Sequence, residues 1–433
     1  MQARLPIVLA GLALAVLPGT GKAQDVGSTT HVMRAGDTLH GLAARWLVRP
    51  AAAAEVQRTN RIVHDRRIPI GTPIHIPRRL LKSVPVALRI AAFSGPVSHG
   101  SGGRMVPASA GAVLSEGSEV ATGAGGFVTL ATPDGSRLSL PSNSRVRLAA
   151  SRRYLIDGAV DFDVEVLSGK AEAKAAPQKP GSGFRLRTPV AVTAVRGTGF
   201  RVGWTGEQGT SLTEVTEGEV GVSTPAASLG LPAGFGVAAR AGESLSRETL
   251  LPAPDAVDPG KVQTEEGLRF TLRPVAGARS YRLRIGRDAG MIDVLAEAES
   301  AEPVIDLPGI GNGTFFLSAT ATAQSGLEGM AQAWSFRRQR LGVAADAGAS
   351  AIPGGLRFNW LASGEGRMSH RFQLFPAAGG GAALVDRPGL AEPGLTLANL
   401  APGAYRWRVG VTSVTPEGAA EVWTPFQTLT ISR

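Results

Sequence analysis

The sequence predicts a mainly β, multidomain protein with a small strand–helix–helix–strand unit, then an all-β domain, then two β-sandwich repeats. Helical spacing of apolar residues is confined to the stretch before residue 60. From residue 86 onward, short alternating runs are separated by Gly, Asp-Gly and Ser, which is typical of strands and turns. Near the C-terminal end, aromatic positions recur with a period near 90, the size of a β-sandwich.

The first 23 residues predict an export signal. Arg4 precedes an apolar run over residues 5–17, and Gly21-Lys22-Ala23 offers a cleavage site after Ala23. Thirteen residues are too few for a permanent span, which needs about 20. We therefore expect a protein of the periplasm or cell envelope with no membrane span after signal cleavage. Cysteine is absent, which excludes disulfides, a lipid-modified cysteine and thiolate metal sites.

The first half of the small unit predicts a strand followed by a helix. Residues 31–34 form a short apolar strand, and Asp37 is placed to cap the helix because its carboxylate can accept free amide protons of the first turn. The spacings of three and four that predict one apolar helical face are those of Leu39, Leu42, Ala43 and Trp46.

The second half predicts another helix and a closing strand. Pro50 interrupts the chain, and residues 51–59 are strong helix formers. Asn60 can end this helix because it tolerates the left-handed conformation. A turn marked by Pro69, Gly71 and Pro73 then leads to a strand at residues 74–76.

Residues 30–80 resemble a LysM domain, a small module that binds peptidoglycan and chitin. The matching pieces are Gly36-Asp37-Thr38-Leu39, Trp46, Asn60-Arg61-Ile62 and the closing stretch 70–77. The resemblance implies that N-acetylglucosamine units bind between two loops, formed by Gly36, Asp37, Thr38 and Leu39 and by Asn60, Arg61, Ile62 and Val63. The alternative is that Asp37 only caps a helix and that Leu39 and Ile62 only fill a small core. Peptidoglycan and chitin both remain open as the ligand.

Positive charge is concentrated in the same region. Residues 31–82 hold ten basic and three acidic side chains, within a chain of net charge +10. Such a module is attracted to anionic envelope polymers, although Arg-rich composition from a GC-rich genome explains the charge equally well. Nucleic acid is disfavoured as a partner because the basic stretch lacks interleaved aromatic residues.

The region 86–224 predicts an all-β domain. Asp134-Gly135 joins two alternating runs, at 127–130 and 137–140, as a hairpin. The further expected strands are 145–148, 161–167, 184–186, 190–195, 199–204, 212–216 and 219–223. Asp161, Asp163 and Glu165 alternate with apolar residues, so we expect them on the solvent face of a strand; a calcium site is the less favoured alternative.

The stretch 187–202 resembles the signature of FecR domains, and residues 116–123 and 217–220 fit the same family. In that family such a domain senses an occupied outer-membrane transporter and signals to a sigma factor through a membrane helix. We expect neither that helix nor the anti-sigma segment in this chain. The most distinctive point is Arg196-Gly197-Thr198, for which a turn that needs glycine is the simpler interpretation.

The C-terminal part predicts a linker at 225–257 and two repeats, at 258–340 and 345–433. Leu268, Phe315 and Trp334 correspond to Leu356, Tyr405 and Trp423 at offsets of 88 to 90. The second repeat is similar to a fibronectin type III domain, in which Tyr405 would form a corner hydrogen bond. We expect the large aromatic residues in the sandwich cores, and give less weight to a role as carbohydrate platforms.

No motif of catalysis accompanies these features. HExxH, GxSxG and a complete phosphate loop are all missing, so we expect no enzyme, cofactor or metal site. The sequence predicts a noncatalytic peptidoglycan-binding envelope protein whose FecR-like and sandwich domains bind an unknown envelope protein. The alternative is a sensor or regulatory component of envelope signalling or transport.

Overall fold

A computed structural model describes residues 27–177, 179, 181–195, 197–378 and 381–432. The chain divides into two compact units, Met1–Ser83 with Tyr154–Gly158, and Val84–Arg153 with Ala159–Arg433. The predicted signal peptide lies outside the described residues. Among the described residues, no helix has the length and apolar character needed to cross a membrane.

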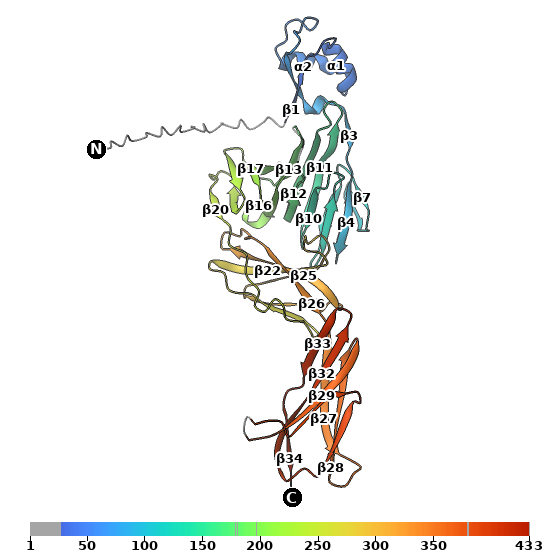
Figure 1. The fold of residues 1–433 in the computed structure, drawn as a ribbon. Helices are drawn as coiled ribbons and strands as arrows, with labels where there is room; N and C mark the ends of the chain where they lie inside the picture. The colour runs from blue at the N-terminus through green and yellow to red at the C-terminus, as the bar shows by residue number, and fades with distance from the viewer. Residues whose placement is uncertain (1–26, 178, 180, 196, 379–380, 433) are drawn as a thin grey trace, which may run out of the picture. The chain divides into compact units, whose positions relative to one another are not determined.

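The first unit consists of a two-stranded sheet and short helices (Figure 1). Its elements are β1 (Ser28–Val32), α1 (Leu39–Trp46), the 3-10 turn η1 (Pro50–Ala52), α2 (Ala53–Thr59), β2 (Pro73–Pro77) and η2 (Arg78–Leu80). The two strands are antiparallel, with Ser28 opposite Pro77 and Val32 opposite Pro73. The buried side chains of this unit include Leu39, Leu42, Val56, Ile74 and Ile76.

Two local predictions for this unit are corrected. Thr38, not Asp37, caps α1, because the Thr38 hydroxyl accepts a hydrogen bond from the Gly41 amide at 2.9 Å. The left-handed residue after α2 is Arg61, with φ of 53°, whereas Asn60 has φ of −95°. Asn60 is held there by its side chain, which bonds to the backbone of β2.

The second unit begins with a closed barrel (Figure 1). Its strands are β3 (Ser83–Pro85), β4 (Leu88–Ser94), β5 (Val97–Ser101), β6 (Arg104–Pro107), β7 (Val113–Leu114), β8 (Glu119–Thr122), β9 (Phe127–Ala131), β10 (Arg137–Leu140), β11 (Arg145–Tyr154), β12 (Val160–Lys174), β13 (Gly183–Arg187), β14 (Val192–Val195), β15 (Gly199–Thr205), β16 (Thr210–Glu217), β17 (Glu219–Ser223), β18 (Ser228–Pro232), β19 (Phe235–Arg240) and β20 (Arg247–Thr249), with the 3-10 turn η3 (Gly206–Gln208) before β16. The predicted hairpin is present, with Arg137 opposite Ala131. Phe162, Phe184 and Phe200 pack in its core, with ring centroids 5.9 and 6.3 Å apart.

The predicted linker at 225–257 is wrong for most of its length. It contains β18 to β20, which pair with β17, β16 and β19 respectively. Leu231, Val237 and Ala239 are buried in the barrel core. Their alternation with polar residues and glycine was the sequence signal that these are strands.

The prediction that Asp161 and Asp163 face solvent is also wrong. Both are buried, because β13 runs parallel to β12 and places Arg185 opposite Asp163. Arg185 donates to Asp161 at 2.6 Å and to Asp163 at 3.1 Å, and Arg187 donates to Asp163 at 2.6 Å. Buried carboxylates are therefore neutralised by arginines, and no group of three or more metal-ligating side chains occurs among the described residues.

Two β-sandwiches complete the second unit. The first contains β21 (Leu268–Thr271), β22 (Ala278–Gly286), β23 (Val294–Ser300), β24 (Val304–Leu307), β25 (Gly313–Ala323) and β26 (Gln332–Arg338). The second contains β27 (Leu341–Ala349), β28 (Gly355–Gly364), β29 (Arg367–Pro376), β30 (Val385–Leu390), β31 (Gly394–Ala398), β32 (Gly403–Thr415), β33 (Gly418–Trp423) and β34 (Gln427–Ile431). The predicted corner bond is present, because the Tyr405 hydroxyl donates to the Ala401 carbonyl at 2.7 Å.

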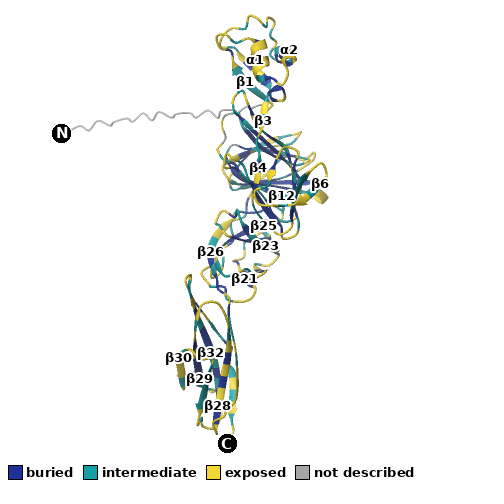
Figure 2. Ribbon diagram, turned by 90° about the vertical axis from the view of Figure 1, so that its right-hand side faces the viewer, coloured by how far each residue is buried: buried dark blue, intermediate teal, exposed yellow. Residues whose placement is uncertain are grey.

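Most but not all of the sandwich aromatics lie in cores. Phe358, Phe372 and Trp407 are buried in the second sandwich, where β28 alternates between buried and exposed positions around Phe358 and Trp360 (Figure 2). Trp423 and Phe426, which we expected in the core, lie outside it. The Arg408 guanidinium is 4.3 Å from the Trp423 ring centroid and 4.7 Å from that of Phe426. Arginine thus covers these rings from the outer face of the sheet.

Candidate glycan-binding site

The predicted site is built from two loops of the first unit. Gly36, Asp37, Thr38 and Leu39 connect β1 to the first turn of α1, and Asn60, Arg61, Ile62 and Val63 follow α2. Gly36 has φ of 83° and Arg61 has φ of 53°, so each loop turns through a left-handed residue. Such turns leave peptide groups exposed that helices and strands would otherwise pair.

Asp37 shapes the first loop and is not a free ligand. His31 Nε2 donates to Asp37 Oδ2 at 2.8 Å, and the Arg34 amide donates to the same oxygen at 2.9 Å. The hydrogen bond from His31, followed by that from Arg34, holds the pKa of the Asp37 carboxyl below its usual value. The second carboxylate oxygen remains available to accept a bond from a sugar hydroxyl or acetamido group.

Thr38 and Leu39 have structural roles in this loop. The Thr38 hydroxyl caps α1, and Leu39 is only 2% exposed in the core. The alternative interpretation, that Leu39 fills the core, therefore holds for its side chain. Any contact of Leu39 with a glycan is made by its backbone.

The second loop is held by side-chain bonds to backbone groups. Asn60 Nδ2 donates to the His75 carbonyl at 2.7 Å and to the Val56 carbonyl at 2.8 Å, while Asn60 Oδ1 accepts from the His75 amide at 2.7 Å. Gln57 closes the turn by donating to the Ile62 carbonyl at 3.1 Å. Asn60 thus positions the loop, whereas Arg61 and Val63 are exposed, Val63 to 81%.

One side-chain contact shows that the segments next to the two loops lie close together. His40 Nδ1, in the first turn of α1, lies 3.8 Å from Asp65 Oδ2, two residues after the second loop. The structure therefore brings together two segments that are more than twenty residues apart in sequence. Both side chains are at the surface, so this contact is not part of the core of the unit.

The turn before β2 adds an exposed apolar side chain, Ile70, that was not among the predicted site residues. The turn before β2 is bonded to Met33, directly after β1: the Gly71 amide donates to the Met33 carbonyl at 2.8 Å, and the Met33 amide donates to the Thr72 carbonyl at 3.0 Å. Ile70 in this turn is 72% exposed. An isoleucine between Pro69 and Gly71, in a turn too tight to bury it, was the available sequence signal.

The most distinctive residues of the FecR signature, Gly197 and Thr198, have structural roles. Gly197 has φ of 72°, and a Cβ there would lie 3.0 Å from Pro177 Cα. Thr198 is buried, and a Cβ on Gly218 would lie 2.6 Å from its methyl group. These contacts favour the turn interpretation of this motif; Arg196 lies outside the described residues.

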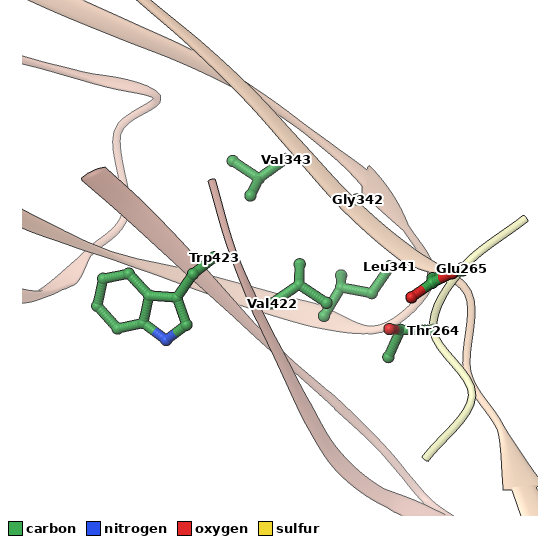
Figure 3. Close-up of a pocket in the computed structure, with 7 residues that line it drawn as sticks. All are labelled: Thr264, Glu265, Leu341, Gly342, Val343, Val422 and Trp423. Carbon is green, nitrogen blue, oxygen red and sulfur yellow. The ribbon is translucent and has the colours of Figure 1, made fainter. Parts of the chain in front are cut away.

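The second unit contains a hollow whose lining includes none of the predicted site residues. It has a volume of about 380 Å³ and is lined by Thr264, Glu265, Leu341, Gly342, Val343, Val422 and Trp423. Figure 3 shows Val422 beside Leu341, with the indole of Trp423 on one side and Thr264 on the other. The lining offers few charged groups and no catalytic constellation.

Comparison with known proteins identifies one domain. Residues 118–221 match the family model described as FecR protein, so the barrel contains a FecR domain. No curated protein matches the chain.

Solved structures are similar to parts of the chain. A protein provisionally described as an anti-sigma factor from Parabacteroides distasonis is 21% identical, covers 30% of this chain and has a TM-score of 0.27. The chain spans 59% of the length of that protein. The fibronectin(III)-like modules of CbhA from Clostridium thermocellum are 11% identical over 40% of this chain and 90% of theirs, with a TM-score of 0.21. A two-domain fibronectin type III segment of chicken tenascin is 18% identical over 42% of this chain and 99% of its own, with a TM-score of 0.20.

Proposed function

We propose that the protein is a noncatalytic component of the periplasm or cell envelope. Its first unit binds N-acetylglucosamine-containing glycan, and peptidoglycan is the favoured ligand. The observation that carries this proposal is the contact of His40 with Asp65, whose side chains lie 3.8 Å apart next to the two loops. A polysaccharide strand needs exposed polar backbone groups and apolar side chains, and the two loops offer both.

The exposed side chains of the site fit such a ligand. Val63 and Ile70 supply aliphatic contact for sugar rings and acetamido methyl groups, while Arg61 and the free Asp37 oxygen supply polar contact. The excess of basic residues in this unit favours approach to an anionic wall polymer. The FecR domain and the sandwiches would then bind an envelope protein.

The test is co-sedimentation of the full chain with purified sacculi. Val63→Asp and Ile70→Asp place a charge on the apolar part of the site and are expected to lower the bound fraction at least tenfold. Val48→Asp is the matched control, because Val48 is 57% exposed in the same unit but lies outside the loops. Equal binding by all of these proteins contradicts the proposal.

Point variants test glycan binding more specifically than deletion of residues 24–82 does. Tyr154 belongs to the same compact unit, where the Arg78 guanidinium lies 5.1 Å from its ring centroid. A chain lacking residues 24–82 exposes that ring and can pellet nonspecifically. Deletion is still informative in one direction, since undiminished specific binding without residues 24–82 contradicts glycan binding by the first unit.

A second candidate function is that of a sensor or regulatory component of envelope signalling or transport. It is favoured by the FecR match at residues 118–221. Deleting the gene is then expected to change transcription of a sigma-factor or transporter regulon, and the Val63→Asp protein is expected to restore it. Unchanged transcripts in the deletion strain contradict this function and leave glycan binding unaffected.

A further inference from the structure

A cluster of buried charges joins the barrel to the first sandwich within the second unit. Four basic side chains meet four carboxylates: Lys170, Arg201, Arg282 and Arg284 with Glu172, Glu214, Glu297 and Glu328. The barrel strands β12, β15 and β16 supply half of them, and the sandwich supplies the rest. Surface ion pairs add little stability, but a buried set costs desolvation and needs accurate geometry.

Glu328 is the centre of the cluster and comes from the loop between β25 and β26. Its side chain is 0% exposed. Lys170 Nζ lies 2.9 Å from Glu328 Oε2, and Arg282 Nε and the Thr320 hydroxyl donate to Oε1 at 3.1 and 2.8 Å. Arg201 Nη1 of the barrel lies 3.5 Å from Oε1, so both oxygens have donors and two of these donors, Lys170 and Arg201, come from the barrel.

The barrel also binds the backbone around Glu328. Arg201 Nη2 donates to the Glu328 carbonyl at 2.7 Å and to the Gly329 carbonyl at 2.6 Å. Glu214 Oε1 accepts from the Glu328 amide at 3.0 Å. Two barrel side chains, both almost fully buried, thus bind three backbone groups of one loop.

The neighbouring residue of the loop fills an apolar site on the barrel. Leu327 is 1% exposed and packs with Leu212 and Leu250. Gly236 of β19 makes room for it, since a Cβ there would lie 3.0 Å from the methyl groups of Leu327. An apolar side chain in a pocket and an acidic side chain bound by an arginine cluster are both features of peptide recognition, and the loop combines them.

We propose that residues 324–331 of the first sandwich are a tethered ligand of the barrel. They bind a face formed by β15, β16 and β19, through Arg201, Glu214 and the apolar site around Leu212. Glu328 is the positioning residue of the loop. The barrel and the first sandwich consequently open as one cooperative unit, independently of whether the first unit binds glycan.

Hydrogen exchange of the full chain, read by mass spectrometry, tests this proposal. Glu328→Ala leaves Arg201, Arg282 and Lys170 without their shared partner. Removing one partner from a buried charge cluster is expected to raise the population of the locally opened state at least about 100-fold. The faster exchange is expected in β16 and β19 of the barrel as well as in β25 of the sandwich. Asp306→Ala is the matched control, because it removes the exposed ion pair with Arg269 from the same sandwich.

The proposal is overturned if the exchange of β16 and β19 stays at the wild-type rate, or rises no more than in Asp306→Ala. Glu328→Gln and Leu327→Ala provide the same comparison if Glu328→Ala does not fold. Gln keeps the shape and one acceptor oxygen, but it removes the charge and replaces the other oxygen with an NH2 group that cannot accept from Lys170 or Arg282. Ala at position 327 empties the apolar site without changing the charge cluster. Both are expected to accelerate exchange in the same barrel strands.

Discussion

At the scale of single residues, the first unit depends on polar side chains that replace missing backbone bonds. Asn60 is the clearest case, because its amide satisfies the amide and carbonyl of His75 and the carbonyl of Val56. Asn60→Ala is expected to destabilise this unit by about 0.5–1.5 kcal/mol, since the His75 amide and carbonyl lose their side-chain partner. Chemical denaturation followed by NMR of the first unit measures the loss.

Asn60→Asp provides the comparison for that prediction. The carboxylate can still accept from the His75 amide but cannot donate to the two carbonyls. We expect an unfolding midpoint below that of the wild type, because two donor bonds are lost. A wild-type midpoint in both variants contradicts the positioning role of Asn60.

The pair of His31 and Asp37 predicts a response to acid. The folded-state pKa of Asp37 is lowered by its bond from His31, so the pair contributes stability above the ordinary carboxyl pKa that is lost as the pH falls through the lowered value. His31→Ala is expected to raise the pKa of Asp37 and to flatten the acid side of the stability profile. Titration of the Asp37 carboxyl carbon by NMR checks this, and an unchanged pKa contradicts it.

At the scale of elements, the parallel pairing of β12 with β13 creates a buried row of ion pairs. Asp163 serves both Arg185 and Arg187. Asp163→Ala is expected to cost about 3–5 kcal/mol, because Arg185 remains buried with one partner fewer. Urea denaturation of the barrel measures this cost.

Glu165 on the same strand is the matched control. It pairs with Arg147, and both side chains are well exposed, at 38% and 45%. Glu165→Ala is expected to cost no more than about 1 kcal/mol. Equal losses of unfolding free energy in Asp163→Ala and Glu165→Ala would contradict a stabilising effect of burying the Asp163 ion pairs.

At the scale of the whole molecule, the two compact units have separate hydrophobic cores. We expect calorimetry of the full chain to show separate transitions for them. Leu42→Ala removes a buried side chain of the first unit and is expected to cost about 2–5 kcal/mol there, lowering only the first unit's transition. A shift of both transitions contradicts independent folding.

Many elements of this fold were predictable because their signals are local. The spacing of Leu39, Leu42 and Ala43 predicts α1, and Asp134-Gly135 predicts the hairpin of β9 and β10. The linker at 225–257 was mistaken because glycine and proline surround its strands and weaken their alternation. For the candidate site, the two loops were predictable, but the structural roles of Leu39 and Asn60 depend on partners elsewhere in the chain.

The sequence by itself determined the mainly β character, the places of most strands, the repeat and the FecR signature, because periodicity and turn residues act over a few positions. Only the tertiary structure decided which charges are buried. Asp163 and Glu328 have no sequence feature that separates them from solvated acids, and their arginine partners come from other strands. Burial is a property of the residues that cover a side chain, and those residues are brought together only by folding.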